Sequence, residues 1–179
     1  MNRSELERIA RKHGTPVVVI DHEEIRRNYA SFRRHLPKVQ AYYAVKANPA
    51  PEIVRTLYRA GASFDVASLP EFMLVYQNVR RLSARARQAF VWDKIVYANP
   101  IKPEETLRAL DRYRPLVTYD NRAELAKIKA HAPHAGLAGR GELHERQTGL
   151  GEVVVVRFED VAARHRVARA GVLEDHREV

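Results

Sequence analysis

The sequence has no cysteine among its 179 residues, and only two methionines and one tryptophan. Without cysteine, a disulfide framework, a thiolate metal site and a cysteine nucleophile are all excluded. No apolar run approaches the roughly 18 residues that a membrane-spanning helix needs. The first residues lead into a charged segment without the apolar core of a secretory signal. These absences predict a cytoplasmic protein that has no membrane partner and no metal site.

Acidic residues are also too few to balance the basic ones, since 22 Asp and Glu stand against 31 Lys and Arg. The resulting charge of +9 raises the question of a nucleic-acid partner. However, many bases occur in pairs such as Arg26-Arg27, Arg33-Arg34 and Arg80-Arg81, which is typical of solvated helix faces. No predicted helix gathers bases beside stacking aromatic residues, as nucleic-acid readers do. We therefore expect no nucleic-acid partner.

The amino-terminal region predicts a helix, a strand and a second helix. Residues 4–13 have Ser4 as a candidate N-cap and Glu7 three positions later, which is the spacing of a capping box. Residues 16–21 form a β-branched run and predict a buried strand. A helix is then expected from residue 21 or 22 to residue 36, because its apolar residues recur at helical spacing.

From residue 42 onward, short apolar runs alternate with helical segments. Such alternation predicts βα units and a parallel sheet. The spacing suits a (β/α) barrel of the TIM type, in which functional groups lie at the carboxyl ends of strands. Five candidate strands make roughly half of such a barrel, and the fold class is therefore α/β, a partial barrel. The strands are expected at 42–46, 63–67, 94–98, 115–119 and 136–140, the helices at 51–60, 69–79, 103–112 and 121–131, and a helical insertion at 79–93.

Residues 141–179 differ in composition from the rest of the chain. They contain no Lys, Pro, Asn, Ser, Ile, Met, Tyr or Trp. We expect a partial barrel domain at 1–140 and an atypical tail at 141–179. The tail has two interpretations: a further βα unit made of residues 153–156 and a helix at 158–170, or a segment from a shifted reading frame or a truncated gene.

Lys46 stands in the otherwise apolar run at residues 42–48. It has two interpretations: a strand-end ammonium that reaches water, or an amine that condenses with an aldehyde as a Schiff base. Asp65 is correspondingly a strand-end cap or a functional acid. Glu71 is a carboxylate in the first turn of a helix or a second functional acid.

Four motifs occur in a fixed order: Tyr43-Ala44-Val45-Lys46-Ala47-Asn48; Ala62-Ser63-Phe64-Asp65-Val66-Ala67-Ser68 with Glu71; Tyr97-Ala98-Asn99-Pro100-Ile101-Lys102; and Val117-Thr118-Tyr119-Asp120 with Glu124-Leu125. Together they resemble the first half of the pyridoxal-phosphate barrel of the ornithine/diaminopimelate/arginine decarboxylase family. The third motif is closer to the ornithine branch than to the diaminopimelate branch. Alanine racemases also have a Val-Lys-Ala sequence, but the residues that follow it here, Asn48-Pro49-Ala50-Pro51, differ from theirs.

The resemblance implies pyridoxal 5'-phosphate as cofactor and Lys46 as the lysine that holds it. It also implies that Asp65 and Glu71 are acidic residues of the catalytic site. The cofactor-binding residues would be Lys46, Ala44, Asp65 and Arg140, the last of which stands where the family has an arginine near the cofactor.

The implied reaction is the decarboxylation of a basic amino acid, with ornithine as the leading substrate and putrescine as the product. The family is commonly homodimeric. Its cofactor-stacking histidine, its glycine-rich phosphate loop and its carboxy-terminal β-domain have no counterpart in residues 141–179, so we expect little activity from this chain alone. The alternatives are a non-catalytic fragment or regulator of the same fold, a diaminopimelate or arginine decarboxylase, and an alanine racemase.

Overall fold

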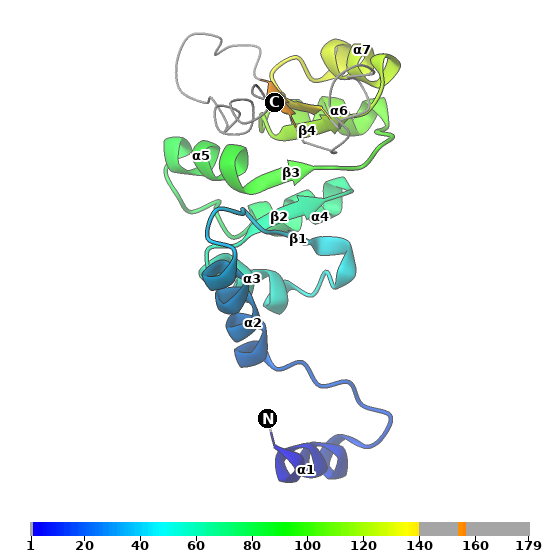
Figure 1. Cartoon of the computed structure of the whole chain (residues 1–179). Coiled ribbons are helices and arrows are strands. Elements are labelled where there is room, and N and C mark those ends of the chain that lie inside the picture. Colours follow the sequence, from blue (N-terminus) through cyan, green and yellow to red (C-terminus); the bar gives the residue numbers. More distant parts are fainter. Residues whose placement is uncertain (1, 140–153, 157–179) are drawn as a thin grey trace, which may run out of the picture.

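The computed structural model describes residues 2–139 and 154–156 of the chain. A single sheet runs through this part and has the strand order β1-β2-β3-β4-β5-β6 (Figure 1). The first five strands are parallel neighbours in chain order, which confirms the predicted βα alternation. The strands are β1 (Tyr42–Ala44), β2 (Ser63–Val66), β3 (Ile95–Tyr97), β4 (Leu116–Tyr119), β5 (Gly136–Gly139) and β6 (Val154–Val156).

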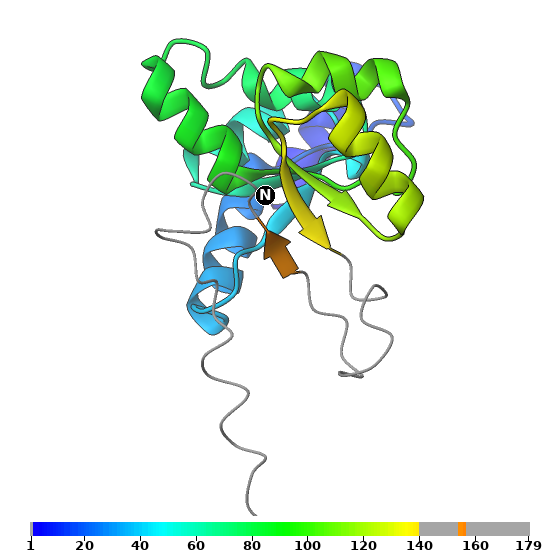
Figure 2. The same cartoon turned by 90° about the horizontal axis from the view of Figure 1, so that it is seen from above.

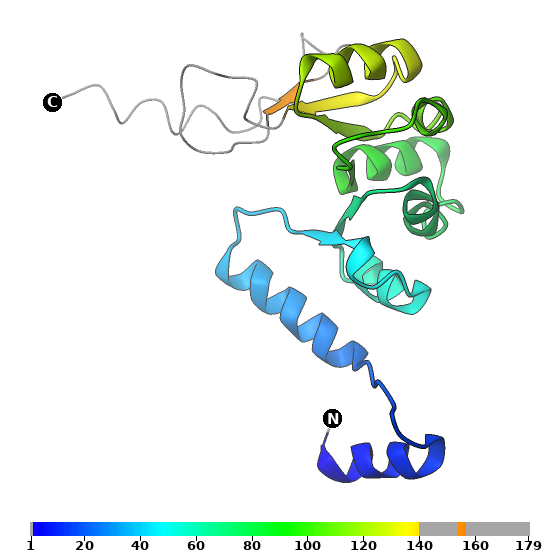
Figure 3. The same ribbon diagram turned by 90° about the vertical axis from the view of Figure 1, so that its right-hand side faces the viewer.

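Helices connect the parallel strands close to the predicted positions, and α5 confirms the helical insertion that was predicted before the third strand. The sheet lies beside α3, α4, α6 and α7, which occupy one side of it in Figure 3. The view from above in Figure 2 shows the same separation. The helices are α1 (Arg3–His13), α2 (His22–His35), α3 (Pro51–Arg59), α4 (Leu69–Tyr76), α5 (Ala84–Lys94), α6 (Glu104–Asp111) and α7 (Arg122–His131).

The hydrophobic core lies between the sheet and these helices. One row of paired strand residues, Val66, Tyr97, Val117 and Leu137, is buried across four strands. Because alternate residues of a strand point to opposite faces, this row belongs to a single face of the sheet. The helices contribute buried side chains at helical spacing to the same cluster: Ile53, Val54, Leu57, Phe72, Val75, Leu107, Leu110 and Ile128.

The opposite face carries a row of mixed character. The row runs across the five parallel strands through Ala44, Asp65, Val96, Leu116 and Gly136. A Cβ atom added to Gly136 would lie 2.3 Å from Cη2 of Trp92, so the indole ring of α5 closes directly over this glycine. The Trp92 ring therefore fills the space beside Gly136 at the amino end of β5. Asp65 lies near the other end of the strands, one residue before the carboxyl end of β2.

The predicted buried strand at residues 16–21 is wrong. This segment is extended but belongs to no strand of the sheet, and the side chain of Val18 is 90% exposed. In Figure 1 it connects α1 to α2 below the sheet. β-Branched residues favour an extended backbone, but only a neighbouring strand makes that backbone part of a sheet. Among the described residues, β1 ends the sheet without such a neighbour on this side.

The predicted N-cap of the first helix is two residues too late. Asn2, not Ser4, caps α1: its Oδ1 accepts a hydrogen bond from the backbone N of Glu5 at 3.0 Å. The carboxylate of Glu5 in turn accepts from the backbone N of Asn2 at 2.8 Å. The Ser4 hydroxyl donates to Asn2 Oδ1 and so supports this cap. Asn2 and Glu5 have the same capping-box spacing as Ser4 and Glu7, and their contacts select the earlier register.

The tail contributes one described strand, β6, which pairs antiparallel with β5. A further βα unit of a barrel would instead add a parallel strand. The strand expected at 153–156 is therefore present at 154–156, but it does not continue the parallel order of the sheet. The helix expected at 158–170 lies outside the described residues.

Candidate active site

Lys46 lies at the carboxyl end of β1, in a short 3-10 turn formed by Val45–Ala47. The strand ends at Ala44, two residues earlier than predicted. Val45 is fully buried and anchors the turn, whereas Lys46 is exposed. The turn is followed by a fixed loop, because the Tyr43 hydroxyl donates to the carbonyl oxygen of Asn48 at 3.0 Å. An accessible amine is thus held on a well-defined turn at the edge where barrel enzymes have their functional groups.

Asp65 lies on β2, the strand adjacent to the one that ends in this turn. It pairs with Ala44 across β1 and β2, and paired residues of adjacent strands share a face. Asp65 is half-buried. Its registered partner Ala44 has one of the smallest side chains. The sequence-predicted group of Ala44, Lys46 and Asp65 is therefore collected at the end of two adjacent strands.

Glu71 lies in the first turn of α4, whose N-cap is Ser68. Its Oε2 accepts a hydrogen bond from the backbone N of Ala67 at 2.9 Å. The described hydrogen bonds of Glu71 are made with the turn between β2 and α4, so its geometry is that of a helix-start carboxylate. Its carboxylate fixes the chain just after Asp65.

Tyr97 and Asn99 contact the carbonyl group of the same residue, Ala67. The hydroxyl of Tyr97 and Nδ2 of Asn99 both donate to the carbonyl oxygen of Ala67, each at 3.1 Å. Burial, and secondly the negative charge of Glu71, raise the pKa of Tyr97 to about 12. The phenol is therefore a neutral hydrogen-bond donor. Our sequence analysis assigned no role to Tyr97, although it is part of the third motif.

A second pair without an assigned role is Lys102 with Glu124. Their side chains are 0% and 6% exposed, and Nζ of Lys102 lies 3.3 Å from Oε1 of Glu124. Burial lowers the pKa of Lys102, while the charge of Glu124 opposes that effect. Both residues belong to recognised motifs, but only the fold shows that they meet.

Arg140 lies outside the described residues. Within the part that the structure describes, no group of His, Asp and Glu residues could hold a metal ion. None of the described helices combines the length and the apolar character needed to cross a membrane.

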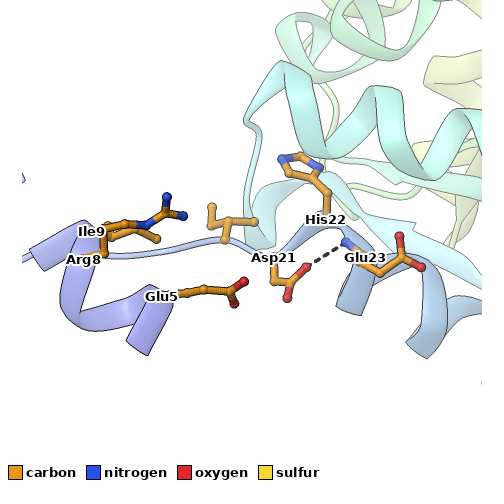
Figure 4. Close-up of a pocket in the computed structure, with 7 residues that line it drawn as sticks. Glu5, Arg8, Ile9, Asp21, His22 and Glu23 are labelled. Atoms are coloured by element: carbon orange, nitrogen blue, oxygen red, sulfur yellow. Dashed lines mark hydrogen bonds between the residues drawn. The ribbon is translucent and has the colours of Figure 1, made fainter. Parts of the chain in front are cut away.

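One open pocket lies between α1 and the start of α2 (Figure 4), and the residues that line it precede the Lys46 turn in the sequence. It is lined by Glu5, Arg8, Ile9, Ile20, Asp21, His22 and Glu23. In Figure 4 the side chains are mostly charged, and Asp21 accepts a hydrogen bond from the backbone of Glu23. None of the site residues predicted from the sequence lines this pocket, so we do not assign it as the cofactor site.

Residues 22–168 match the sequence model of the pyridoxal-dependent decarboxylases, specifically that of their pyridoxal-binding domain. The chain belongs to this family. The match confirms the family resemblance and pyridoxal phosphate as the cofactor of the family.

Individual relatives agree with this assignment. The chain is 33% identical over 141 residues to a lysine/ornithine decarboxylase of Selenomonas ruminantium, covering 78% of this chain and 33% of that protein. It is 41% identical over 117 residues to an ornithine decarboxylase of Candida albicans, covering 65% of this chain and 23% of that protein. It is also 33% identical over 123 residues to antizyme inhibitor 2 of Xenopus laevis, covering 68% of this chain and 26% of that protein. The chain thus spans a third or less of the length of these relatives.

Solved structures confirm the partial barrel. A lysine/ornithine decarboxylase of Vibrio vulnificus in complex with putrescine has a TM-score of 0.65 and 30% identity, covering 82% of this chain and 38% of that chain. A complex of the Selenomonas enzyme with pyridoxal phosphate and cadaverine has a TM-score of 0.65 and 31% identity, covering 84% of this chain and 37% of that chain. The βα units described above are therefore part of a pyridoxal-dependent decarboxylase barrel.

The residues present fit the part of the cofactor that carries the aldehyde. An exposed primary amine is required to bind an aldehyde covalently, and Lys46 supplies one at the edge of the sheet. Asp65 supplies a carboxylate on the adjacent strand in register with Ala44.

Proposed function

We propose that this chain provides the cofactor-attachment part of a decarboxylase that acts on a basic amino acid, with ornithine as substrate and putrescine as product. The observation that carries the proposal is the position of Lys46, which is exposed on a turn anchored by the buried Val45 at the carboxyl end of β1. It occurs in a chain of the pyridoxal-dependent decarboxylase family. The substrates named for relatives, ornithine and lysine, support the same class of substrate.

The residues of this chain have distinct tasks in the proposal. Lys46 would hold the aldehyde of the cofactor through its amine, and Asp65 would stabilise the charged form of that amine whenever it is not bound to the aldehyde. Ala44 places a small side chain at the position registered with Asp65. When bound, the pyridoxal ring would accept the electron pair of the bond between the substrate Cα atom and its carboxylate, which leaves as carbon dioxide. Glu71 keeps the backbone after Asp65 in position through Ala67.

Covalent labelling tests the proposal directly. The protein is incubated with pyridoxal phosphate, reduced with borohydride and examined by peptide mass spectrometry. We expect a pyridoxyl group on Lys46, its loss in Lys46→Met, and its retention in Lys38→Met, which removes another exposed lysine. Label spread evenly over exposed lysines, or label that is insensitive to Lys46→Met, would overturn the proposal.

A second candidate function is a non-catalytic partner of the same fold. It is favoured by the similarity to antizyme inhibitor 2. Release of carbon dioxide from ornithine, lysine and arginine distinguishes the two functions. Turnover that depends on Lys46 supports the decarboxylase, while a labelled but inactive protein supports the non-catalytic partner. We further propose a homodimer, which light scattering on the purified protein tests.

A further inference from the structure

Lys102 is the most deeply buried cation in the described part of the chain, and it lies at the end of the loop that follows β3. Oε1 of Glu124 accepts hydrogen bonds from both Nζ and the backbone N of Lys102, at 3.3 Å and 3.1 Å. Oε2 of Glu124 contacts Nζ of Lys127 at 2.7 Å, nearer the surface. Asn121 caps α7 and accepts from the backbone N of Glu124 at 2.8 Å. One carboxylate thus fastens the loop after β3 to the first turn of α7.

This arrangement is better suited to positioning than to stability. Burying an ammonium and a carboxylate costs solvation that their attraction only partly repays, and apolar replacements of buried pairs are often neutral or stabilising. The pair also differs from the exposed pair Arg108–Glu104, which bridges one turn of a single helix. Lys102 and Glu124 instead belong to two different βα units, and their contact includes a backbone N–H.

The loop that Lys102 ends begins at Asn99. Oδ1 of Asn99 accepts from the backbone N of Ile101 at 3.3 Å, which closes a tight turn inside the loop. Nδ2 of the same side chain donates to the carbonyl oxygen of Ala67. The backbone N of Ala67 donates to Glu71. A continuous series of contacts therefore connects Glu124 on the fourth βα unit to Ala67, two residues after Asp65.

We propose that Lys102 and Glu124 are positioning residues that hold Asn99 against Ala67, and thereby fix the β2–α4 turn beside the Lys46 site. The effect on Lys46 rests on the proposed function, whereas the effect on Ala67 does not. Neither residue contacts the site itself. Their role is to keep the carboxyl ends of β2, β3 and β4 in one fixed arrangement.

The backbone contact allows a matched pair of variants. Lys102→Met with Glu124→Leu removes the ion pair and also the acceptor of the residue 102 backbone N–H. Lys102→Met with Glu124→Gln removes the same charges but keeps an amide oxygen as that acceptor. Lys127→Met is the control, since it removes only the outer contact of Glu124.

Hydrogen exchange of the Ala67 amide is the principal measurement, because this amide donates to Glu71 at the far end of the series. In the Met/Leu variant we expect it to exchange about tenfold faster, as for the loss of one hydrogen bond. The pyridoxyl yield on Lys46 should fall in the same variant. The Met/Gln variant and Lys127→Met should resemble the wild type in both measurements.

Several outcomes would overturn the proposal. Unchanged exchange of the Ala67 amide in a folded Met/Leu variant would show that the pair does not affect Ala67. Faster exchange of this amide with unchanged labelling of Lys46 would show that the effect does not reach the Lys46 site. If the Met/Leu variant unfolds, Asn99→Ala tests the last contact alone, and unchanged exchange there is equally contrary. Absence of label on wild-type Lys46 with the expected exchange pattern would refute the proposed function and support the positioning role at Ala67.

Discussion

Ala44 and Asp65 are registered neighbours in the parallel pair β1–β2, on the face opposite the buried core. Ala44 is two residues before Lys46 in the chain. The pairing therefore places a carboxylate on the strand adjacent to the lysine turn, although 18 residues separate Lys46 from Asp65 in sequence. This relationship makes the contribution of Asp65 to the reactivity of Lys46 testable.

Asp65→Asn should raise the pyridoxyl yield on Lys46 about threefold to tenfold, because a carboxylate nearby favours the charged amine, whereas only the neutral amine condenses with an aldehyde. The change keeps the shape of the side chain, so the fold should persist. Asp93→Asn is the control, since Asp93 is an exposed acid at the end of α5. Equal yields for the two variants would argue against a role of Asp65. Peptide mass spectrometry after borohydride reduction provides the measurement.

The raised pKa of Tyr97 predicts a loss of stability at alkaline pH. The pKa is about 12 in the folded protein against 10.0 for an ordinary tyrosine, because of burial and then the charge of Glu71. The stabilising contribution is fully present below pH 10 and is lost as the pH rises to about 12, because the unfolded chain releases the proton first. The free energy of unfolding should decrease on the order of 2 kcal/mol over this window.

Tyr97→Phe should remove this component of the pH dependence and also lower stability by about 1 kcal/mol at neutral pH, through loss of the hydrogen bond to Ala67. Urea unfolding followed by circular dichroism measures both effects. Tyr58→Phe is the control, because it keeps the ring that contacts Phe90. A Tyr97→Phe profile with the same alkaline decline as the wild type would contradict the assignment.

Gly136→Ala should destabilise the protein by about 1–3 kcal/mol, which is typical of overpacking. The added methyl group would lie 2.3 Å from Cη2 of Trp92, and part of the ring of α5 would have to move. Trp92 is the only tryptophan of the chain, so its fluorescence reports the movement. Gly136→Ala combined with Trp92→Leu should be less destabilised than the sum of the single changes. Strict additivity would show that the two residues are not in contact.

Glu124 predicts a loss of stability in acid. Burial by itself raises the pKa of Glu124, but the hydrogen bond from Lys127 and the charge and hydrogen bonds of Lys102 outweigh it, so that the pKa is lowered from 4.5. The stabilising contribution is therefore present above pH 4.5 and is lost as the pH falls through the folded-state pKa. Glu124→Gln should flatten this part of the unfolding profile. Glu104→Gln, in an exposed pair, should leave it unchanged.

Much of the fold was predictable because each βα unit has local signals. The parallel strands and their order were predicted from apolar runs, such as those before Asn99 and Asp120, and from the helical spacing between these runs. The segment at 16–21 was predicted wrongly for the same reason, since its β-branched residues favour an extended backbone whether or not a neighbouring strand is present. The N-cap at Asn2 was missed because two residues with the same spacing competed, and only the observed contacts separate them.

The candidate site was predictable to the extent that its chemistry belongs to single residues. Lys46 and Asp65 were assigned as site residues because their motifs resemble those of the family, and these assignments stay predictions. Tyr97, Lys102 and Glu124 were not assigned roles, because their significance is a contact and not a residue type. An ammonium at Lys102 has the same sequence signature whether it is solvated or fully buried.

The sequence by itself determined the family, the alternation of strands and helices, and the lysine at the end of β1, because these depend on local composition and on motif order. Only the tertiary structure decided that Asp65 lies beside Ala44, that Trp92 closes over Gly136, and that Lys102 is paired with Glu124. These contacts join residues from different βα units. They are set by strand register and by the burial of charge, neither of which is a property of any one segment.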